Sequence, residues 1–286
     1  MGYAASGRGQ AGAAVRENDV TSPTIRFFAY ACALVFALAG VLALAPKLAA
    51  QDMMRGLDLN SPQYTTAEMT RVEIEKLLAA GKKPDLSSKS LNGLDLSGLD
   101  FSGVNFRAAR LNKTKFRGAK LESAILDQTW AIGADFSGAD LTHASLFAAQ
   151  MQKANFDDAD LSYARIAGDF SDAQMRKTNF VKANLSADMT NQSMGLMRAV
   201  LNSADLRGAD FQGANLSRAA LEFAKLSGAN LADADLAGAD AAGADFRGVI
   251  LGNTNLKGCD VTSAMIDAPQ AHFFAVAAHV DRVIKK

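Results

Sequence analysis

The chain is poor in the residues that metal sites and disulfide frameworks need. It has two cysteines, Cys32 and Cys259, and three histidines in 286 residues. Two cysteines cannot form a disulfide framework, and neither has the spacing of a metal ligand. The motifs G-x-S-x-G, H-E-x-x-H, C-x-x-C and the P-loop do not occur. We therefore expect no metal, no cofactor and no enzymatic activity.

The chain also lacks net charge. Lysine plus arginine equals aspartate plus glutamate, at 30 each. Residues 85–266 contain 18 basic and 21 acidic residues, a nearly even balance. A chain that captures or imitates nucleic acid through bulk charge needs a large excess of one sign. We therefore expect no nucleic-acid partner.

What the chain has in abundance is a five-residue unit, Ala-(Asp/Asn)-(Leu/Phe)-x-x, which runs from about residue 86 to residue 266. Three copies in succession fill residues 204–218. When the central Leu or Phe is numbered i, position i is large and apolar and position i−2 is small, usually Ala. Neither the period of a helix nor that of a strand explains both columns. A chain that turns a corner every five residues does, with pairs such as Ser97-Gly98 and Arg117-Gly118 in the bends.

This tandem resembles the pentapeptide-repeat family over roughly 180 residues. The resemblance implies an all-β fold, a right-handed, four-sided β-helix solenoid with about twenty residues per coil. Residues twenty apart would then stack in columns, two of which are Leu96, Phe116, Phe136, Phe156 and Phe101, Leu121, Leu141, Leu161. Outward residues at i−1 would alternate in charge, as in Asp95, Lys115 and Asp135, and His143 would stack over Tyr163.

Some members of that family imitate DNA and protect or inhibit DNA gyrase, as in quinolone resistance. Those members resemble strongly acidic, cytosolic, dimeric rods. This chain departs from them in its balanced charge and in its apolar N-terminal segment.

The five-residue frame is irregular over residues 167–200. The step from Ile166 to the next good centre, Phe170, is four residues, and no frame is clean over residues 186–200. The pattern resumes at Leu201 in a frame in which the net shift cancels. We therefore predict one continuous solenoid over residues 85–266, with a bulge or loop inside it.

The N-terminal part has two segments before the linker. Residues 1–24 are rich in Gly, Ala and Ser and predict a disordered tail. Residues 25–46 contain an uncharged apolar run, 27–45, that is long enough to span a bilayer as an uncleaved anchor. A signal peptide that is cleaved after Leu48-Ala49-Ala50 is the alternative. Arginines before the run favour an inside N-terminus, which would place the repeats outside the cytoplasm.

A capping helix is predicted between the linker at residues 47–64 and the first repeat. Thr65 and Glu68 have the spacing of a capping box, which predicts a helix over residues 65–84. Gly81 supplies a left-handed end to this helix. A solenoid needs such a cap because its first coil exposes apolar interior and an unpaired edge.

A second helix is predicted over residues 267–286. Asp267 is a plausible cap and Pro269 is tolerated in a first turn. The apolar residues that follow fall on one helical face, so we expect this helix to cover the last coil.

One surface departs from the repeat in both aromatic and basic content. It combines Trp130 with five bases of one coil, Arg110, Lys113, Lys115, Arg117 and Lys120. Trp130 stands at an outward i−1 position before the undersized centre Ala131, and Arg110 lies twenty residues earlier, within reach of a cation–π contact. The ring either covers the gap at Ala131 or anchors a partner. The bases either form a solvated collar or bind an anion or a partner.

A second departure is the group of Met189, Met194 and Met197 in the irregular segment. Methionine suits adaptable contact surfaces, and it also suits a loop that packs onto the solenoid. Both interpretations stay open at this point.

Together these features predict a non-enzymatic, membrane-anchored solenoid that acts as a protein-interaction or structural module in the cell envelope. We expect a single pass through the inner membrane by residues 27–45, with the repeats outside the cytoplasm, and an unknown protein partner. A DNA-mimicking regulator of DNA gyrase or topoisomerase is the alternative that the family resemblance suggests.

Overall fold

The computed structural model describes residue 58 and residues 61–81, 83–190, 197–279 and 283–285. Apart from residue 58, these belong to one compact unit, Leu59–Lys286. The predicted tail and the predicted span at residues 25–46 lie outside the described residues. Within the described part of the chain, no helix is both long enough and apolar enough to cross a membrane.

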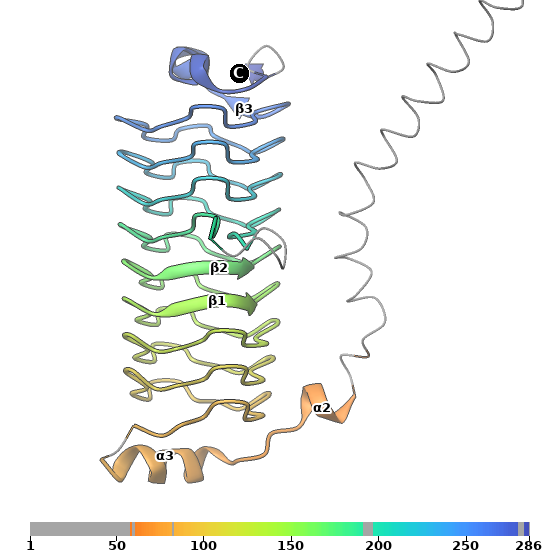
Figure 1. The fold of residues 1–286 in the computed structure, drawn as a ribbon, viewed down its shortest axis with the longest axis vertical. Coiled ribbons are helices and arrows are strands. Elements are labelled where there is room, and N and C mark those ends of the chain that lie inside the picture. The colour runs from red at the N-terminus through yellow and green to blue at the C-terminus, as the bar shows by residue number, and fades with distance from the viewer. Residues whose placement is uncertain (1–57, 59–60, 82, 191–196, 280–282, 286) are drawn as a thin grey trace, which may run out of the picture. The chain divides into compact units, whose positions relative to one another are not determined.

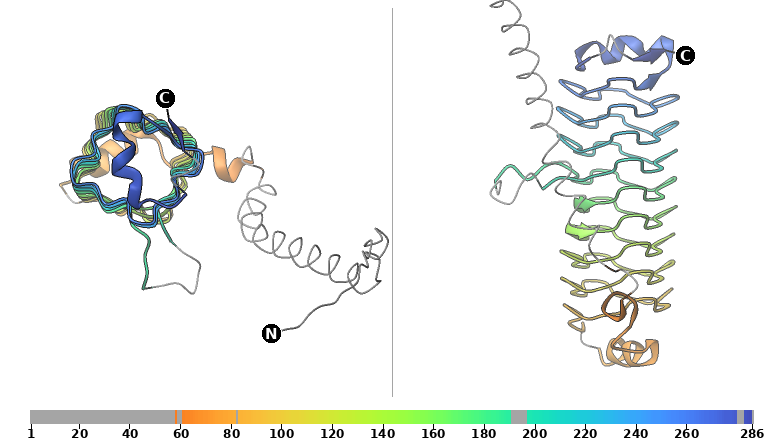
Figure 2. Two further views of the ribbon diagram at one scale, coloured as in Figure 1. Left: turned by 90° about the horizontal axis from the view of Figure 1, so that it is seen from above. Right: turned by 90° about the vertical axis from the view of Figure 1, so that its right-hand side faces the viewer.

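The repeats fold into a column of stacked coils (Figure 1). Each outward i−1 residue pairs in parallel with a residue on the next coil, and the usual separation is twenty residues, as between Asp95 and Lys115. Main-chain hydrogen bonds make these pairings, such as the 2.8 Å bond that the N–H of Leu96 donates to the carbonyl oxygen of Lys115. Viewed from above, the coils superimpose as a four-sided ring (Figure 2). The predicted all-β solenoid is confirmed.

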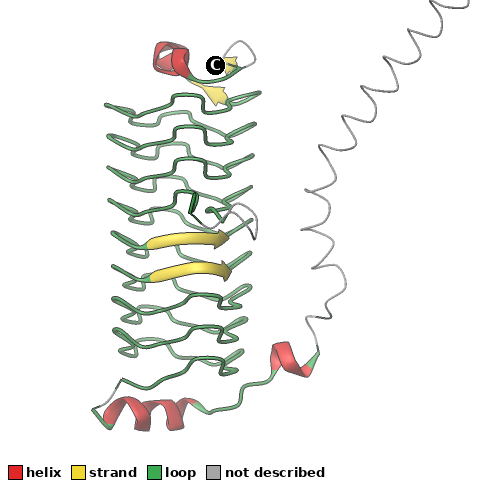
Figure 3. Ribbon diagram, viewed as in Figure 1, coloured by secondary structure: helices red, strands yellow, loops and turns green. Residues whose placement is uncertain are grey.

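Most pairings join single residues because a corner interrupts the chain every five residues (Figure 3). In the described residues, continuous strands occur at two places. β1 (Ser145–Gln150) pairs in parallel with β2 (Arg165–Asp169), and near the C-terminus β3 (Met265–Ile266) pairs in parallel with β4 (Ile284–Lys285).

Inward side chains fill the column. The large side chains at i and the small ones at i−2 are buried along its whole length, as Leu121 and Ala119 are, at 0% exposure. The rings of Phe116, Phe136 and Phe156 stack face to face, with successive centroids 5.1 and 4.9 Å apart. The twenty-residue columns predicted from the sequence are therefore confirmed.

The Asp or Asn at i−1 shapes each corner. Its side-chain oxygen accepts a hydrogen bond from the backbone N–H two residues later, as Asp95 does from Ser97 at 3.1 Å. The corner closes when the N–H of residue i+3 donates to the carbonyl oxygen of residue i, as Leu99 does to Leu96 at 3.4 Å. Residue i+2 is left-handed, with φ of 72° at Gly98. The repeat favours Asp or Asn before its centre, and often Gly after it, because this turn requires them.

Two coils depart from twenty residues, and both lie within the predicted irregular region. At β2 the chain is one residue short, so Gln150 pairs with Asp169 and the later pairings are 19 residues apart, as between Asn155 and Gln174. On the next coil the pairings are 31 residues apart, as between Gln174 and Asp205. The extra residues leave the column near Asp188, whose N–H donates to the carbonyl oxygen of Met197 at 2.7 Å. The repeat therefore continues further into this region than its sequence indicated.

The N-terminal cap begins later than predicted. α3 (Arg71–Ala79) has Thr70 as its N-cap, and Thr70 forms the capping box with Glu73. The predicted box at Thr65 and Glu68 is therefore wrong. Both pairs have the same spacing, but the N–H of Glu68 donates to the first coil, to the carbonyl oxygen of Ser90 at 2.7 Å, and this holds residue 68 extended.

α3 closes the first coil as a cap. Its Ile74 is fully buried in the core, and Gly81 after the helix has the predicted left-handed conformation, with φ of 74°. A second short helix, α2 (Pro62–Thr65), lies in the stretch that the sequence indicated as linker.

The C-terminal cap is not the α-helix predicted over residues 267–286. η2 (Ala268–Val276) is a 3-10 helix. Asp267 does not cap it, because its carboxylate accepts a hydrogen bond from the N–H of Gly248 at 2.6 Å. Phe274 enters the core, where its ring meets that of Phe246 with centroids 5.4 Å apart.

After η2 the chain is extended, and the predicted helical face beyond Val276 is wrong. Ala278 pairs with Asp260, and β4 pairs with β3. The open edge of the last coil offers backbone hydrogen bonds that a helix cannot accept, so this segment adds to the column instead.

We expect Gly168→Ala to destabilise the protein. A Cβ at Gly168 would collide with the carbonyl oxygen of Ala149 and lie 2.9 Å from its nitrogen, because β2 is one residue short there. The expected loss in the free energy of unfolding is about 1–3 kcal/mol, the usual cost of overpacking. Denaturant unfolding measures it.

Gly138→Ala is the matched control. A Cβ there meets nothing within 4 Å, so only the positive φ of 63° opposes it. Equal denaturant midpoints for the two variants would contradict the close approach at Gly168.

Candidate functional site

The five predicted bases surround one coil. Arg110, Lys115 and Lys120 occupy outward i−1 positions on three successive faces, and Lys113 and Arg117 lie at the corners between them. Trp130 lies on the same face as Arg110 and pairs with it on the next coil. The structure therefore brings Trp130 together with Arg110, while the other bases turn away around the column.

Acidic side chains compensate the bases of this collar. Lys115 lies 3.9 Å from Asp95, and Arg117 forms an ion pair with Asp135. Arg110 forms an ion pair of 3.5 Å with Glu68. Exposed pairs of this kind add little stability, but they cancel the local charge. The solvated collar is the interpretation that these contacts favour.

Trp130 is half-buried and is covered by another part of the chain. Its ring stacks on that of Tyr64 in α2, with centroids 5.6 Å apart and an angle of 26° between the planes. Among the described residues, the cation–π contacts are those of Arg165 with Phe147 and Lys182 with Tyr163. The expected contact between Arg110 and Trp130 is therefore not formed, and Trp130 anchors the chain's own N-terminal segment.

We call residues 61–69 the N-terminal strap. The strap runs along the face that carries Ser90, Arg110 and Trp130. The Oγ of Ser90 donates to the carbonyl oxygen of Thr66 at 2.5 Å, and Ala67 pairs antiparallel with Leu91. In Figure 2, α2 lies outside the ring of coils.

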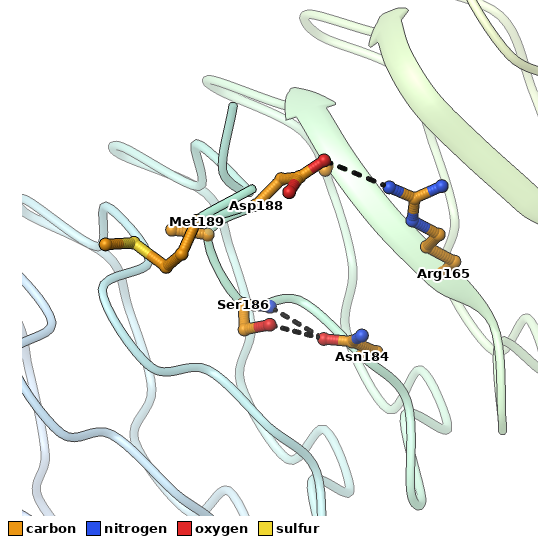
Figure 4. Close-up of a pocket in the computed structure, with 7 residues that line it drawn as sticks. Arg165, Asn184, Ser186, Asp188 and Met189 are labelled. Atoms are coloured by element: carbon orange, nitrogen blue, oxygen red, sulfur yellow. Dashed lines mark hydrogen bonds and ion pairs between the residues drawn. The ribbon is translucent and has the colours of Figure 1, made fainter. Parts of the chain in front are cut away.

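A small cavity of about 190 Å³ lies where the 31-residue coil begins to leave the column (Figure 4). Arg165 lines it, forms an ion pair of 3.6 Å with Asp188, and lies 4.3 Å from the ring centroid of Phe147. Met189 also lines it and is 46% exposed; Met194 lies outside the described residues. The charged groups of this cavity already have protein partners, so we assign it no chemistry.

Groups suited to metal binding or nucleophilic chemistry are scarce in the described part of the chain. No cluster of three or more His, Cys, Asp or Glu residues there could hold a metal ion. Burial raises the pKa of the Cys259 thiol to about 12, which keeps it protonated and unreactive. His143 stacks on Tyr163, as predicted, with centroids 5.0 Å apart.

The family model for pentapeptide repeats matches eight copies, over residues 90–128, 124–162, 196–231 and 224–262. The chain belongs to the pentapeptide-repeat family. The matches to the family omit residues 163–195, where the 19-residue coil and the start of the loop lie.

Solved pentapeptide-repeat structures resemble the chain as well. HetL, involved in heterocyst differentiation regulation in the cyanobacterium Nostoc sp. strain PCC 7120, is 26% identical over 70% of this chain and 98% of its own, with a TM-score of 0.38. Full-length QnrB1, a plasmid-mediated fluoroquinolone resistance protein, is 20% identical over 64% of this chain and 96% of its own, with a TM-score of 0.35. No curated protein matches the chain.

Tyr64 is the residue that the sequence did not identify. It lies in the predicted linker, outside the pentapeptide repeats, so no period points to it. A signal is nevertheless present, because Tyr64 is the sole aromatic residue between residues 46 and 100. A lone aromatic side chain in an otherwise polar linker indicates a docking contact.

The corner aspartates have lowered pKa values. Hydrogen bonds from Ser97 lower the pKa of Asp95, with a smaller contribution from the charge of Lys115. Hydrogen bonds from Ser102 lower the pKa of Asp100 in the same way. A carboxylate whose pKa is lower in the folded state stabilises the fold above its unfolded pKa of about 4 and loses that contribution as the pH falls through its folded pKa.

We therefore expect Asp95→Asn with Asp100→Asn to flatten the acid side of the stability curve. The amide oxygen of Asn still accepts the backbone bond, as Asn105 does from Arg107 at 3.0 Å, but it does not titrate. The melting temperature of wild type should fall more steeply than that of the variant below about pH 4. Asn105→Asp is the reverse control and should steepen the fall. Identical slopes for all three proteins would contradict this account.

Proposed function

We propose that this pentapeptide-repeat protein is a non-enzymatic solenoid that is anchored in the inner membrane by residues 27–45. In this proposal the column lies outside the cytoplasm and acts as a protein-interaction or structural module of the cell envelope. The anchor rests on the sequence, since these 19 residues carry no charge.

The filled interior of the column is the observation that carries the interaction role. Side chains at i and i−2 are buried on every side of the coils, and the ends are closed by Ile74 and Phe274. Such a column offers ligands its outer faces. Long, regular outer faces are the surfaces that repeat proteins use to bind proteins.

The local charge pattern favours this proposal over imitation of DNA. A mimic of DNA presents rows of free carboxylates. Here the aspartates at i−1 accept backbone hydrogen bonds, as Asp95 and Asp210 do, and several pair with arginine, as Asp205 does with Arg207 at 2.6 Å. The carboxylates therefore serve the corners of the column.

Membrane topology tests the proposal. We expect the full chain to stay with the membrane after carbonate extraction, and a reporter fused after Lys286 to be active only when it lies outside the cytoplasm. Phe36→Arg is the control, because an arginine at the centre of a span costs roughly 2.5–3.5 kcal/mol of insertion. This variant should lose membrane retention and reporter activity together.

Two results would contradict the proposal. Reporter activity confined to the cytoplasm would reverse the topology, and a soluble form that starts near Gln51 would indicate cleavage of a signal peptide. Inhibition of DNA gyrase supercoiling by the purified chain at stoichiometric concentration would favour the DNA-mimicking alternative.

A further inference from the structure

The N-terminal strap is held firmly at one end and weakly at the other. Near the first coil, Glu68 donates its N–H to Ser90 at 2.7 Å, and Thr66 accepts a 2.5 Å bond from the Ser90 hydroxyl. Toward Trp130, the polar contact is a long bond of 3.5 Å from the side-chain amide of Asn112 to the carbonyl oxygen of Tyr64. At this end the ring stack of Tyr64 on Trp130 is the main contact.

Docking of the strap leaves polar atoms unsatisfied. The Nε of Arg110 and the Oγ of Ser61 are buried without a hydrogen-bond partner among the described residues. A buried polar atom without a partner costs free energy. The fit between the strap and the column is therefore imperfect at the end that carries Tyr64, and another segment can match or exceed it.

The contacts of the strap define what this surface recognises. Trp130 offers an aromatic face in place of the usual Asp or Asn, Asn112 offers an amide donor to a main-chain carbonyl, and Arg110 offers a cation to a carboxylate. An extended segment with an aromatic residue and a carboxylate four positions later, as in Tyr64 and Glu68, meets all three. Aromatic and arginine side chains at a partly buried site are typical anchors of interfaces.

We propose that Trp130, Asn112 and Arg110 form a peptide-docking groove that the strap occupies as an internal ligand. The groove takes, by exchange with the strap, an extended segment of a partner protein with an aromatic residue and a carboxylate four positions on. This inference rests on the proposed function in treating the column as a protein-binding surface. It does not depend on the topology of the anchor.

The strap competes with such a partner because it is tethered. A tethered segment acts at an effective concentration on the order of millimolar. Free peptide therefore binds wild type weakly, and binds more strongly once the strap has lost the side chain that stacks on Trp130. An aromatic stack accounts for up to roughly tenfold in affinity.

Trp130 is the only tryptophan of the chain, so its fluorescence reports directly on this groove. The test uses the full chain in detergent, as wild type, Tyr64→Ala and Tyr64→Phe. We expect Tyr64→Ala to shift the emission to longer wavelength and to increase quenching by acrylamide. Tyr64→Phe keeps an aromatic ring and should resemble wild type. Thermal unfolding verifies that each variant is folded.

The probe is the peptide Ser-Pro-Gln-Tyr-Thr-Thr-Ala-Glu-Met, which copies residues 61–69. We expect it to reverse the emission shift of Tyr64→Ala in a saturable manner and to bind wild type roughly tenfold more weakly. The same peptide with alanine in place of its tyrosine is the control and should leave the emission unchanged.

Two results would overturn the groove. One is an emission spectrum of Tyr64→Ala that equals that of wild type, because Trp130 would then not be covered by Tyr64. The other is a peptide that leaves the emission of Tyr64→Ala unchanged or that binds no better than its alanine control. Either result leaves the proposed function standing on the other faces, whereas an inverted topology refutes the anchor and leaves the groove intact.

Discussion

The structure depends on the inward stacking of large apolar side chains at a separation of one coil. Rings such as those of Phe136 and Phe156, 4.9 Å between centroids, bring successive coils to the spacing at which their backbones form hydrogen bonds. Each fully buried Leu or Phe contributes about 1.5–3 kcal/mol. The alanines at i−2 leave room for these side chains, and the Asx turns supply the corners. Because the interior is thereby filled, binding is left to the outer faces and their own covering segment.

Much of the fold could be predicted because its contacts repeat. The five-residue period located the corners, and the twenty-residue coil placed Phe116 over Phe136 and His143 over Tyr163. The shortened coil was visible as a four-residue step at Phe170. Its physical cause, the contact of Gly168 with the backbone of Ala149, required the structure.

The ends and the candidate site could not be predicted, because their contacts do not repeat. Two Thr-x-x-Glu sequences fit a capping box, and only pairing with Ser90 excludes the one at Thr65. The C-terminal segment has helical periodicity, yet the edge of the last coil makes it extended after Val276. Trp130 was singled out for its place in the repeat, but its partner Tyr64 belongs to no period. The composition of a repeat thus identifies an unusual residue and leaves its contact unknown.

The central claim is that one continuous column runs through the irregular region, with the extra residues placed outside it. Cysteine pairs test this most directly, in a chain with Cys32→Ser and Cys259→Ala. Gln174 and Asp205 are parallel neighbours, so cysteines at these positions should lie about 4.8 Å apart and oxidise to a disulfide. A pair at 174 and 194, the separation of an ordinary coil, should not. A disulfide between 174 and 194 with none between 174 and 205 would contradict the account.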